Sequence, residues 1–270
     1  MRQLRASAYA SMFVGMLVWA TSVLADTTPN SLWIGNDQNT TFPILNTTTT
    51  GTVLRTIPGT SAIGFAIDES SNRLYVNSGF GGGIYNLDTL ASVGSFSLPH
   101  SSEDMTFAGG FIWSGDFFGQ AIDKVDPATG TRVGGFPLGF TPLGLTTDGA
   151  GGFWVSEFTS GALLRHYDGS GNLLGTLNPA DITDFRGGLA FDPRDGTLYI
   201  GTSNSVFHYT TGGVDLGHFD TGDNRFVDGL EFSAAETAVP EPASIILVGV
   251  GVPMVIGLRR RVGARTATGE

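Results

Sequence analysis

The chain has 270 residues, 40 of them glycine, and a formal net charge of −11 at pH 7 with a pI near 4.6. Such an acidic chain repels nucleic acid and anionic lipid, so we expect no nucleic-acid partner. It contains no cysteine, which excludes disulfide bonds and thiol catalysis and leaves the hydrophobic core to hold the fold.

Residues 1–25 have the layout of a cleaved secretory signal peptide. Two arginines form a positive start, an apolar stretch covers Met12–Ala20, and small residues precede a cleavage point between Ala25 and Asp26. A retained membrane anchor is the less favoured alternative, because the apolar stretch is shorter than the ~20 residues of a spanning helix. We therefore expect export across the inner membrane.

An aromatic-rich strand pattern then recurs at intervals of 37 to 45 residues. Its copies are Leu32–Gly35, Leu74–Asn77, Phe111–Ser114, Phe153–Ser156 and Leu198–Gly201. A second pattern precedes each of the last four copies and occurs once more near the C-terminus. Its copies are Ile63–Asp68, Asp104–Phe107, Leu143–Asp148, Gly188–Asp192 and Asp228–Phe232. Two further strand patterns separated by turns complete each repeat.

Four strands in each repeat of about 40–50 residues are typical of a propeller blade. Such small sheets bury both faces only when they stack around an axis. The sequence predicts an all-β propeller of about five four-stranded blades over residues 26–238. Six blades, a β-sandwich and a β-solenoid are the alternatives. The repeats resemble the broad family of repeat-strand β-propellers with hairpins such as Asp126–Gly130, a resemblance that bears on architecture and not on function.

Residues 239–270 form a three-part C-terminal segment. A short motif is followed by an apolar run, Ala243–Leu258, and by a basic stop in the tail 259–270. The run has 16 residues, which is marginal for a transmembrane helix unless flanking residues extend it. The motif is Val239, Pro240, Glu241 and Pro242, and the stop is Arg259, Arg260 and Arg261. The positive-inside rule then leaves the preceding domain outside the inner membrane.

This three-part pattern resembles the PEP-CTERM sorting signal of Gram-negative bacteria. The resemblance implies that a membrane-embedded exosortase is a partner, with the membrane-anchored chain as an intermediate on the way to the cell surface or the medium. It also implies an association with exopolysaccharide and biofilm. An ordinary unprocessed anchor is the alternative. Residues 1–25 and 243–270 hold six arginines and one glutamate, so their removal takes the net charge from −11 to −16.

Few residues have the spacing of a catalytic site, and we predict no catalytic residue. The histidines, His100, His166, His208 and His218, show no metal-ligand spacing, and no nucleophile elbow or phosphate-binding loop is present. The glycine run Gly79–Gly83 is expected to form a hairpin or loop. Four phenylalanines are expected in loops, where they either fill gaps between blades, which we favour, or bind sugar rings or peptide. They are Phe117, Phe118, Phe140 and Phe158.

Aspartates recur near the second strand pattern in successive repeats. They are Asp68, Asp104, Asp148, Asp192 and Asp228. A propeller brings such positions around one axis, where oxygen ligands can hold Ca²⁺. A role as turn residues is favoured, because Asp side chains bond their own backbone two residues on. We therefore expect no metal cofactor, with Asp104 and Asp228 as the weak candidates for a Ca²⁺ site.

The leading hypothesis is an exported, non-enzymatic binding or structural protein of the cell envelope or extracellular matrix. The alternative is a divalent-cation-dependent propeller hydrolase or lyase of the lactonase kind. Convergence of several carboxylates at the channel mouth would favour the alternative. The residues concerned are Glu103, Asp104, Glu157, Asp184 and Asp228.

Overall fold

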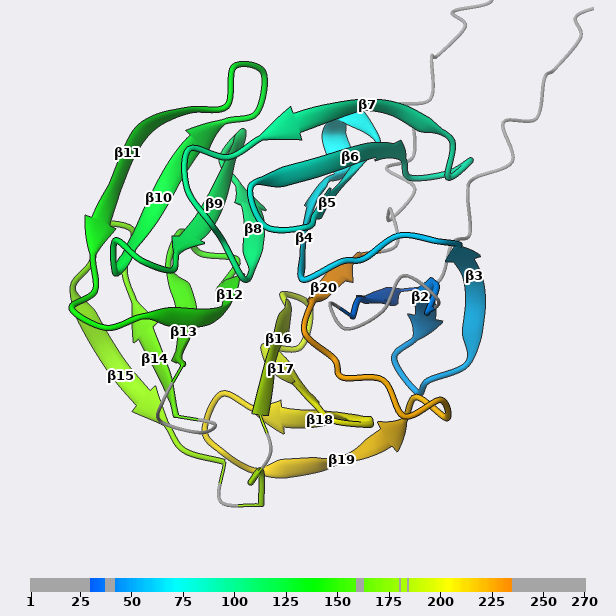
Figure 1. Cartoon of the computed structure of the whole chain (residues 1–270). Helices are drawn as coiled ribbons and strands as arrows, with labels where there is room; N and C mark the ends of the chain where they lie inside the picture. The colour runs from blue at the N-terminus through cyan, green and yellow to red at the C-terminus, as the bar shows by residue number, and fades with distance from the viewer. Residues whose placement is uncertain (1–29, 37–41, 159–162, 180, 184, 235–270) are drawn as a thin grey trace, which may run out of the picture. The chain divides into compact units, whose positions relative to one another are not determined.

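The repeated strand patterns fold into five separate four-stranded antiparallel sheets set around one axis (Figure 1). The computed structural model describes residues 30–36, 42–158, 163–179, 181–183 and 185–234. Within these residues the predicted five-bladed β-propeller is confirmed, and the sandwich, the solenoid and the sixth blade are not found.

Each blade consists of four strands from an innermost to an outermost position. Blade 1 consists of β20 (Leu230–Ser233), β1 (Ser31–Ile34), β2 (Ile44–Thr48) and β3 (Val53–Ile57). Blade 2 consists of β4 (Gly64–Asp68), β5 (Arg73–Asn77), β6 (Gly81–Asn86) and β7 (Ser92–Ser97). A short 3-10 helix, η1 (Glu69–Ser71), joins β4 to β5.

The other three blades follow in chain order. Blade 3 consists of β8 (Met105–Ala108), β9 (Phe111–Asp116), β10 (Ala121–Asp126) and β11 (Thr131–Pro137). Blade 4 consists of β12 (Pro142–Thr147), β13 (Phe153–Glu157), β14 (Leu164–Tyr167) and β15 (Leu173–Leu177). Blade 5 consists of β16 (Phe185–Asp192), β17 (Thr197–Thr202), β18 (Ser205–Thr210) and β19 (Asp215–Asp220).

The hydrophobic core is divided among the contacts between neighbouring blades. Five buried clusters exist, and each joins side chains of two adjacent blades. Between blades 2 and 3, for example, Tyr75 and Phe96 pack with Met105 and Ile112. In blade 2 the two inner strands, β4 and β5, are almost fully buried, whereas the outermost strand β7 buries only Phe96. Burial on both faces explains why the aromatic-rich strands are continuously apolar.

The ring is closed by a strand from the far end of the chain. β20 pairs with β1 in antiparallel register, from Ser31 opposite Ser233 to Ile34 opposite Leu230, so the last strand completes the first blade (Figure 1). This pairing accounts for the additional copy of the second strand pattern near the C-terminus. The fully buried Arg225 lies just before β20, donates to the Pro43 carbonyl at 2.7 Å and pairs with Asp223.

The prediction that the glycine run forms a hairpin or loop is confirmed, because the run lies in the hairpin of β5 and β6. Gly79 lies in the connection before β6, and Gly81–Gly83 form the first half of β6. A Cβ atom on Gly82 would lie 2.0 Å from the Val76 carbonyl oxygen, so glycine is required by the close approach of two strands.

No helix among the described residues is long and apolar enough to cross a membrane. The predicted signal peptide 1–25 and transmembrane helix 243–258 lie outside those residues.

Candidate functional site

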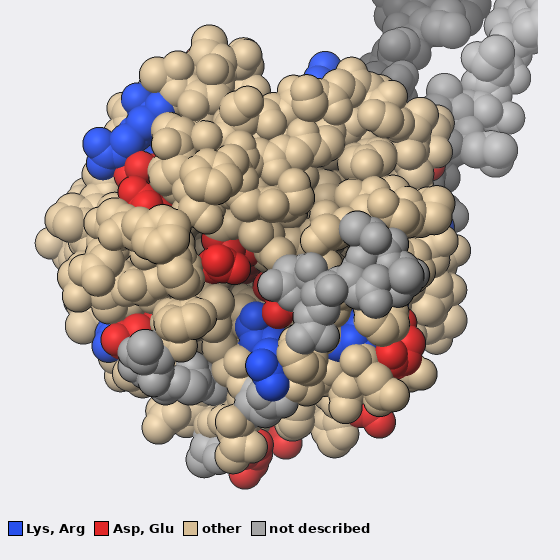
Figure 2. Space-filling model, viewed as in Figure 1, with Lys and Arg blue, Asp and Glu red and all other residues tan. Residues whose placement is uncertain are grey.

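The central axis of the propeller has two mouths with different residues. The upper mouth is the end at which the inner strands begin, and the lower mouth is the end at which they finish. Because Ser31 pairs with Ser233, the described chain enters and leaves at the lower mouth. Figure 2 shows acidic side chains near the centre of the face in view, with basic ones beside them.

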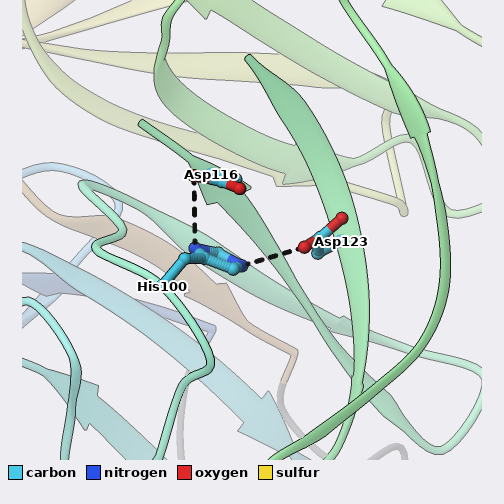
Figure 3. Close-up of side chains that lie close together, drawn as sticks. All are labelled: His100, Asp116 and Asp123. Atoms are coloured by element: carbon cyan, nitrogen blue, oxygen red, sulfur yellow. Dashed lines mark ion pairs between the residues drawn. The ribbon is translucent and has the colours of Figure 1, made fainter. Parts of the chain in front are cut away.

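A histidine lies between two aspartates at the upper end of blade 3 (Figure 3). His100 comes from the β7–β8 connection, Asp116 ends β9, and Asp123 lies in β10. The His100 Nδ1 atom is 4.0 Å from Asp116 Oδ1, and its Nε2 atom is 3.4 Å from Asp123 Oδ2. All three side chains are at least four-fifths buried. The β9–β10 hairpin brings the aspartates together, because Asp123 pairs with Ser114.

Further polar groups hold this histidine cluster (His100, Asp116 and Asp123) in place. The Ser114 hydroxyl is 3.2 Å from His100 Nε2, and Arg132 Nε donates to Asp123 Oδ1 at 2.6 Å. These contacts fix the orientation of the imidazole between the two carboxylates.

A divalent cation fits this cluster only in part. One ligand atom from each residue lies within 4.8 Å of the others, and within the described ranges this is the one such group of three His, Asp or Glu side chains. However, the two aspartates contact opposite ring nitrogens, and a metal ion binds only one nitrogen of a ring. Arg132 also already neutralises one oxygen of Asp123. A cation would need one aspartate to turn toward the other.

Sequence spacing could not have revealed this cluster. His100 was considered only for short histidine motifs, and Asp116 and Asp123 were not candidates. The three residues come from three segments of blade 3, and the hairpin register that brings them together is not encoded in any local motif.

An exposed aromatic patch, made of Phe117, Phe118 and Phe158, lies beside the cluster. The Phe117 ring centroid is 5.2 Å from that of Phe118 and 5.2 Å from that of Phe158, in edge-to-face geometry. Phe118 is 79% exposed and Phe158 is 53% exposed. Phe117 and Phe118 directly follow β9 of blade 3, and Phe158 directly follows β13, the equivalent strand of blade 4. The patch therefore spans two blades.

The predicted loop positions of these phenylalanines are therefore confirmed. The favoured role of filling gaps between blades fits Phe140. Its ring packs against the hydrophobic core between blades 3 and 4, and the Arg165 guanidinium lies over it. This role does not fit Phe118 or Phe158, whose rings are mostly in solvent. The rings of Phe118 and Phe158 are therefore accessible to a binding partner.

Most of the aspartates singled out in the sequence are turn residues, as favoured. Asp68 Oδ1 accepts from the backbone N–H of Ser71, Asp148 Oδ1 from Ala150, and Asp192 Oδ1 from Arg194. These bonds fix the turns that follow the inner strands.

Asp104 has a different role, because it links three blades. It is 1% exposed, and its two oxygens accept from the backbone N–H groups of Met105 at 2.9 Å and Leu145 at 3.0 Å. Burial raises the pKa of Asp104 well above its usual value, and hydrogen bonds from Leu145, Met105 and Phe65 offset this only in part. A carboxyl engaged in this way is poorly placed to bind Ca²⁺.

The convergence of carboxylates that would favour the hydrolase or lyase is not found among the described residues. Glu103, Glu157 and Asp228 are half-buried at the upper mouth, but none belongs to a group within metal-binding reach. Glu157 instead pairs with Arg165 at 2.7 Å. Asp184 lies outside the described residues, as do the cleavage point, the sorting motif and the basic stop.

The lower mouth contains a cavity of about 150 Å³ that all five blades line. Each blade contributes to its wall, through Ile67, Thr106, Thr147, Phe191 and Phe232. Glu231 also lines it, and half-buried Glu69 lies at its edge.

Glu231 is a buried carboxyl that is incompletely hydrogen-bonded. It is 4% exposed; Oε1 accepts from the Phe232 N–H at 3.1 Å, and Oε2 has no partner among the described residues. Burial raises the pKa of Glu231 to about 8, and the negative charge of Glu69 acts in the same direction. The Thr106 hydroxyl and the Phe232 N–H act in the opposite direction.

Glu231 was not singled out in the sequence, although a comparison of the repeats contains the signal. The equivalent position in the other inner strands holds a small side chain in every blade: Ala66, Thr106, Thr146 and Ala190. A glutamate at this position breaks the repeat.

No family model and no curated protein matches the chain. Two solved structures are similar in fold, each with a TM-score of 0.54 over 76% of this chain and 99% of the other. One is a chain of a nidogen/laminin complex at 16% identity, and the other is a protein of unknown function from Bacteroides caccae at 10% identity. At such low identity the likeness extends to the propeller fold alone.

The raised pKa of Glu231 predicts that Glu231→Gln stabilises the protein increasingly as pH rises. Between the ordinary pKa of 4.5 and the folded value of about 8, the unfolded chain releases a proton that the folded chain retains. Folded stability therefore falls with pH in this window, by up to ~1.4 kcal/mol per pH unit, and the glutamine removes this fall. Urea unfolding at a series of pH values measures the difference.

The two proteins should differ least near pH 4, which serves as the internal reference. A difference in unfolding free energy that stays constant from pH 4 to about 9 would contradict the assignment.

Proposed function

We propose that this chain is an exported binding or structural protein of the cell envelope or extracellular matrix, sorted by an exosortase and linked to exopolysaccharide. Support comes from the sequence pattern at the two ends and from the geometry between them. Both ends of the described chain lie at the lower mouth, so attachment through the C-terminus leaves the loops of the upper face unobstructed. This arrangement is the observation that most favours a presented binding surface.

The partner we propose is a polysaccharide that contacts the aromatic patch on the upper face. Phenylalanine rings offer flat apolar surfaces to the C–H faces of sugar rings, and nearby charged groups can bind hydroxyls. The salt bridge between Glu157 and Arg165 lies beside Phe158 and supplies such groups. The strong negative charge makes a neutral glycan a better partner than an acidic one.

Sorting predicts loss of the tail when the chain is expressed with an exosortase. Mass spectrometry of the mature protein should then show an N-terminus at Asp26 and no peptide containing Arg259–Arg261. A variant with alanine at Pro240, Glu241 and Pro242 should keep its tail. If the unaltered chain keeps the arginines in the presence of active exosortase, the sorting proposal is wrong.

Polysaccharide binding predicts that Phe118→Ala and Phe158→Ala weaken retention on the producing organism's exopolysaccharide by about tenfold, as for an exposed binding hot spot. Affinity electrophoresis measures this retention. Phe80→Ala is the matched control, because Phe80 is 68% exposed on the upper face of blade 2 and makes no ring contact with another aromatic side chain of the described residues. Equal losses for all three variants, or none, would exclude the patch.

A second candidate is a divalent-cation-dependent hydrolase or lyase, favoured by the histidine cluster alone. A bound cation would stabilise the folded state, by ~2.7 kcal/mol at a concentration of 100 times Kd. This candidate predicts that millimolar Zn²⁺ or Ca²⁺ raises the melting temperature of the unaltered protein and not that of His100→Gln. An unchanged melting temperature in both proteins would remove it.

A further inference from the structure

The cavity at the lower mouth combines an apolar wall with two carboxyl groups. Ile67, Phe107, Phe191 and Phe232 supply most of the wall, and Glu231 and Glu69 supply the carboxyls. The lining includes the exposed Pro193, so the cavity reaches the surface. Its volume of about 150 Å³ equals the share of about five waters in the liquid, enough for a ligand of about five heavy atoms.

Glu231 is the feature of this cavity that neither the fold nor the turns explain. The other blades place alanine or threonine at the same position, so the propeller does not need a carboxyl there. A buried Oε2 atom without a hydrogen-bond partner costs free energy on the order of 1–3 kcal/mol. Oε2 is covered from solvent, so a ligand in the cavity that donates to this carboxyl would offset the cost once the Glu231 side chain turns toward it.

We propose that the lower cavity binds a primary alkylammonium group, with the ammonium paired to Glu231 and Glu69 and the carbon chain against the apolar wall. An ammonium has three donors and no acceptor, which matches carboxyl oxygens that have spare acceptor capacity. Glu69 Oε1 already accepts from the Ser233 hydroxyl at 2.8 Å, which fixes this carboxyl at the edge of the cavity.

Other ligand classes match the cavity less well. A Ca²⁺ ion takes six to eight oxygen ligands, whereas this wall is mostly carbon with two carboxyls and two threonine hydroxyls, from Thr106 and Thr147. An anion would face two carboxyls. A neutral hydrocarbon would leave Glu231 Oε2 without a partner.

Binding must release a proton near neutral pH. Free Glu231 is largely protonated at pH 7, and pairing with an ammonium requires the carboxylate, so one proton passes to the buffer for each ligand bound. The other titratable groups that act on Glu231 are Glu69 on η1 and Asp104 before β8. From β12 and β16 the cavity wall contributes Thr147 and Phe191, which do not titrate.

Isothermal titration calorimetry of the full-length protein in non-ionic detergent tests this proposal. The probe is n-butylammonium, and n-butanol is the neutral analogue of equal size. We expect saturable binding of the amine alone, with affinity that rises up to tenfold per pH unit toward pH 8. Buffers of different ionisation enthalpy should report one proton released per amine at pH 7.

Two variants test whether binding depends on the carboxylate of Glu231 rather than on the overall negative charge of the protein. Glu231→Gln should lower the affinity for n-butylammonium at least tenfold, while Glu103→Gln at the upper mouth should leave it unchanged. Thermal unfolding confirms that both variants are folded. Equal binding of n-butanol, unchanged affinity in Glu231→Gln, or no binding of the amine at pH 8 would each overturn the proposal.

A third probe, the peptide acetyl-Gly-Lys-Gly-amide, distinguishes the two sources of the same chemistry. Peptide binding as tight as that of n-butylammonium would assign the cavity to a lysine side chain of a partner protein. Binding of the free amine alone would assign it to a small amine. Both results support an alkylammonium site, and both are independent of whether the tail is processed.

Discussion

Closure of the ring by β20 is the interaction on which the rest of the structure depends. A four-stranded sheet has two faces to bury, and each of the five core clusters is shared between two neighbouring blades. If β20 did not pair with β1, the contact between blades 5 and 1 would lose Leu230 and Phe232 and expose Leu32. The chain has no cysteine, and among the described residues this pairing is the one sheet link between the first and last strands. The buried Arg225 adds a polar contact at the same junction.

The same closure gives the two mouths different chemistry. The upper mouth is formed by connections between blades, where length and sequence vary without disturbing the core. The histidine cluster and the aromatic patch lie there. The lower mouth is formed by the ends of the inner strands, so its cavity takes its side chains from the most buried part of every blade. Glu231 lies in β20, the strand that closes the ring, so the cavity has its full lining only when β20 is paired with β1.

Asp104 and Glu231 show how differently two buried carboxyls can be used. Asp104 accepts backbone N–H groups from neighbouring inner strands, which makes it a link between blades. Glu231 has one oxygen without such a donor. Burial raises the pKa of both, but only the second has an oxygen without a donor, in a side chain that lines a cavity. Desolvation alone therefore does not mark a binding site; the incomplete hydrogen bonding does.

The sequence by itself determined the all-β class, the blade count and the place of nearly every strand, because the repeated patterns are local and each copy supports the others. It also determined the role of turn aspartates such as Asp148, whose hydrogen bonds reach only a few residues along the chain. Only the tertiary structure decided which distant residues meet. Asp116 and Asp123 approach through hairpin pairing, Phe117 and Phe158 through the packing of two blades, and Glu231 and Glu69 through closure of the ring. These contacts depend on the placement of whole sheets, which no spacing along the chain expresses.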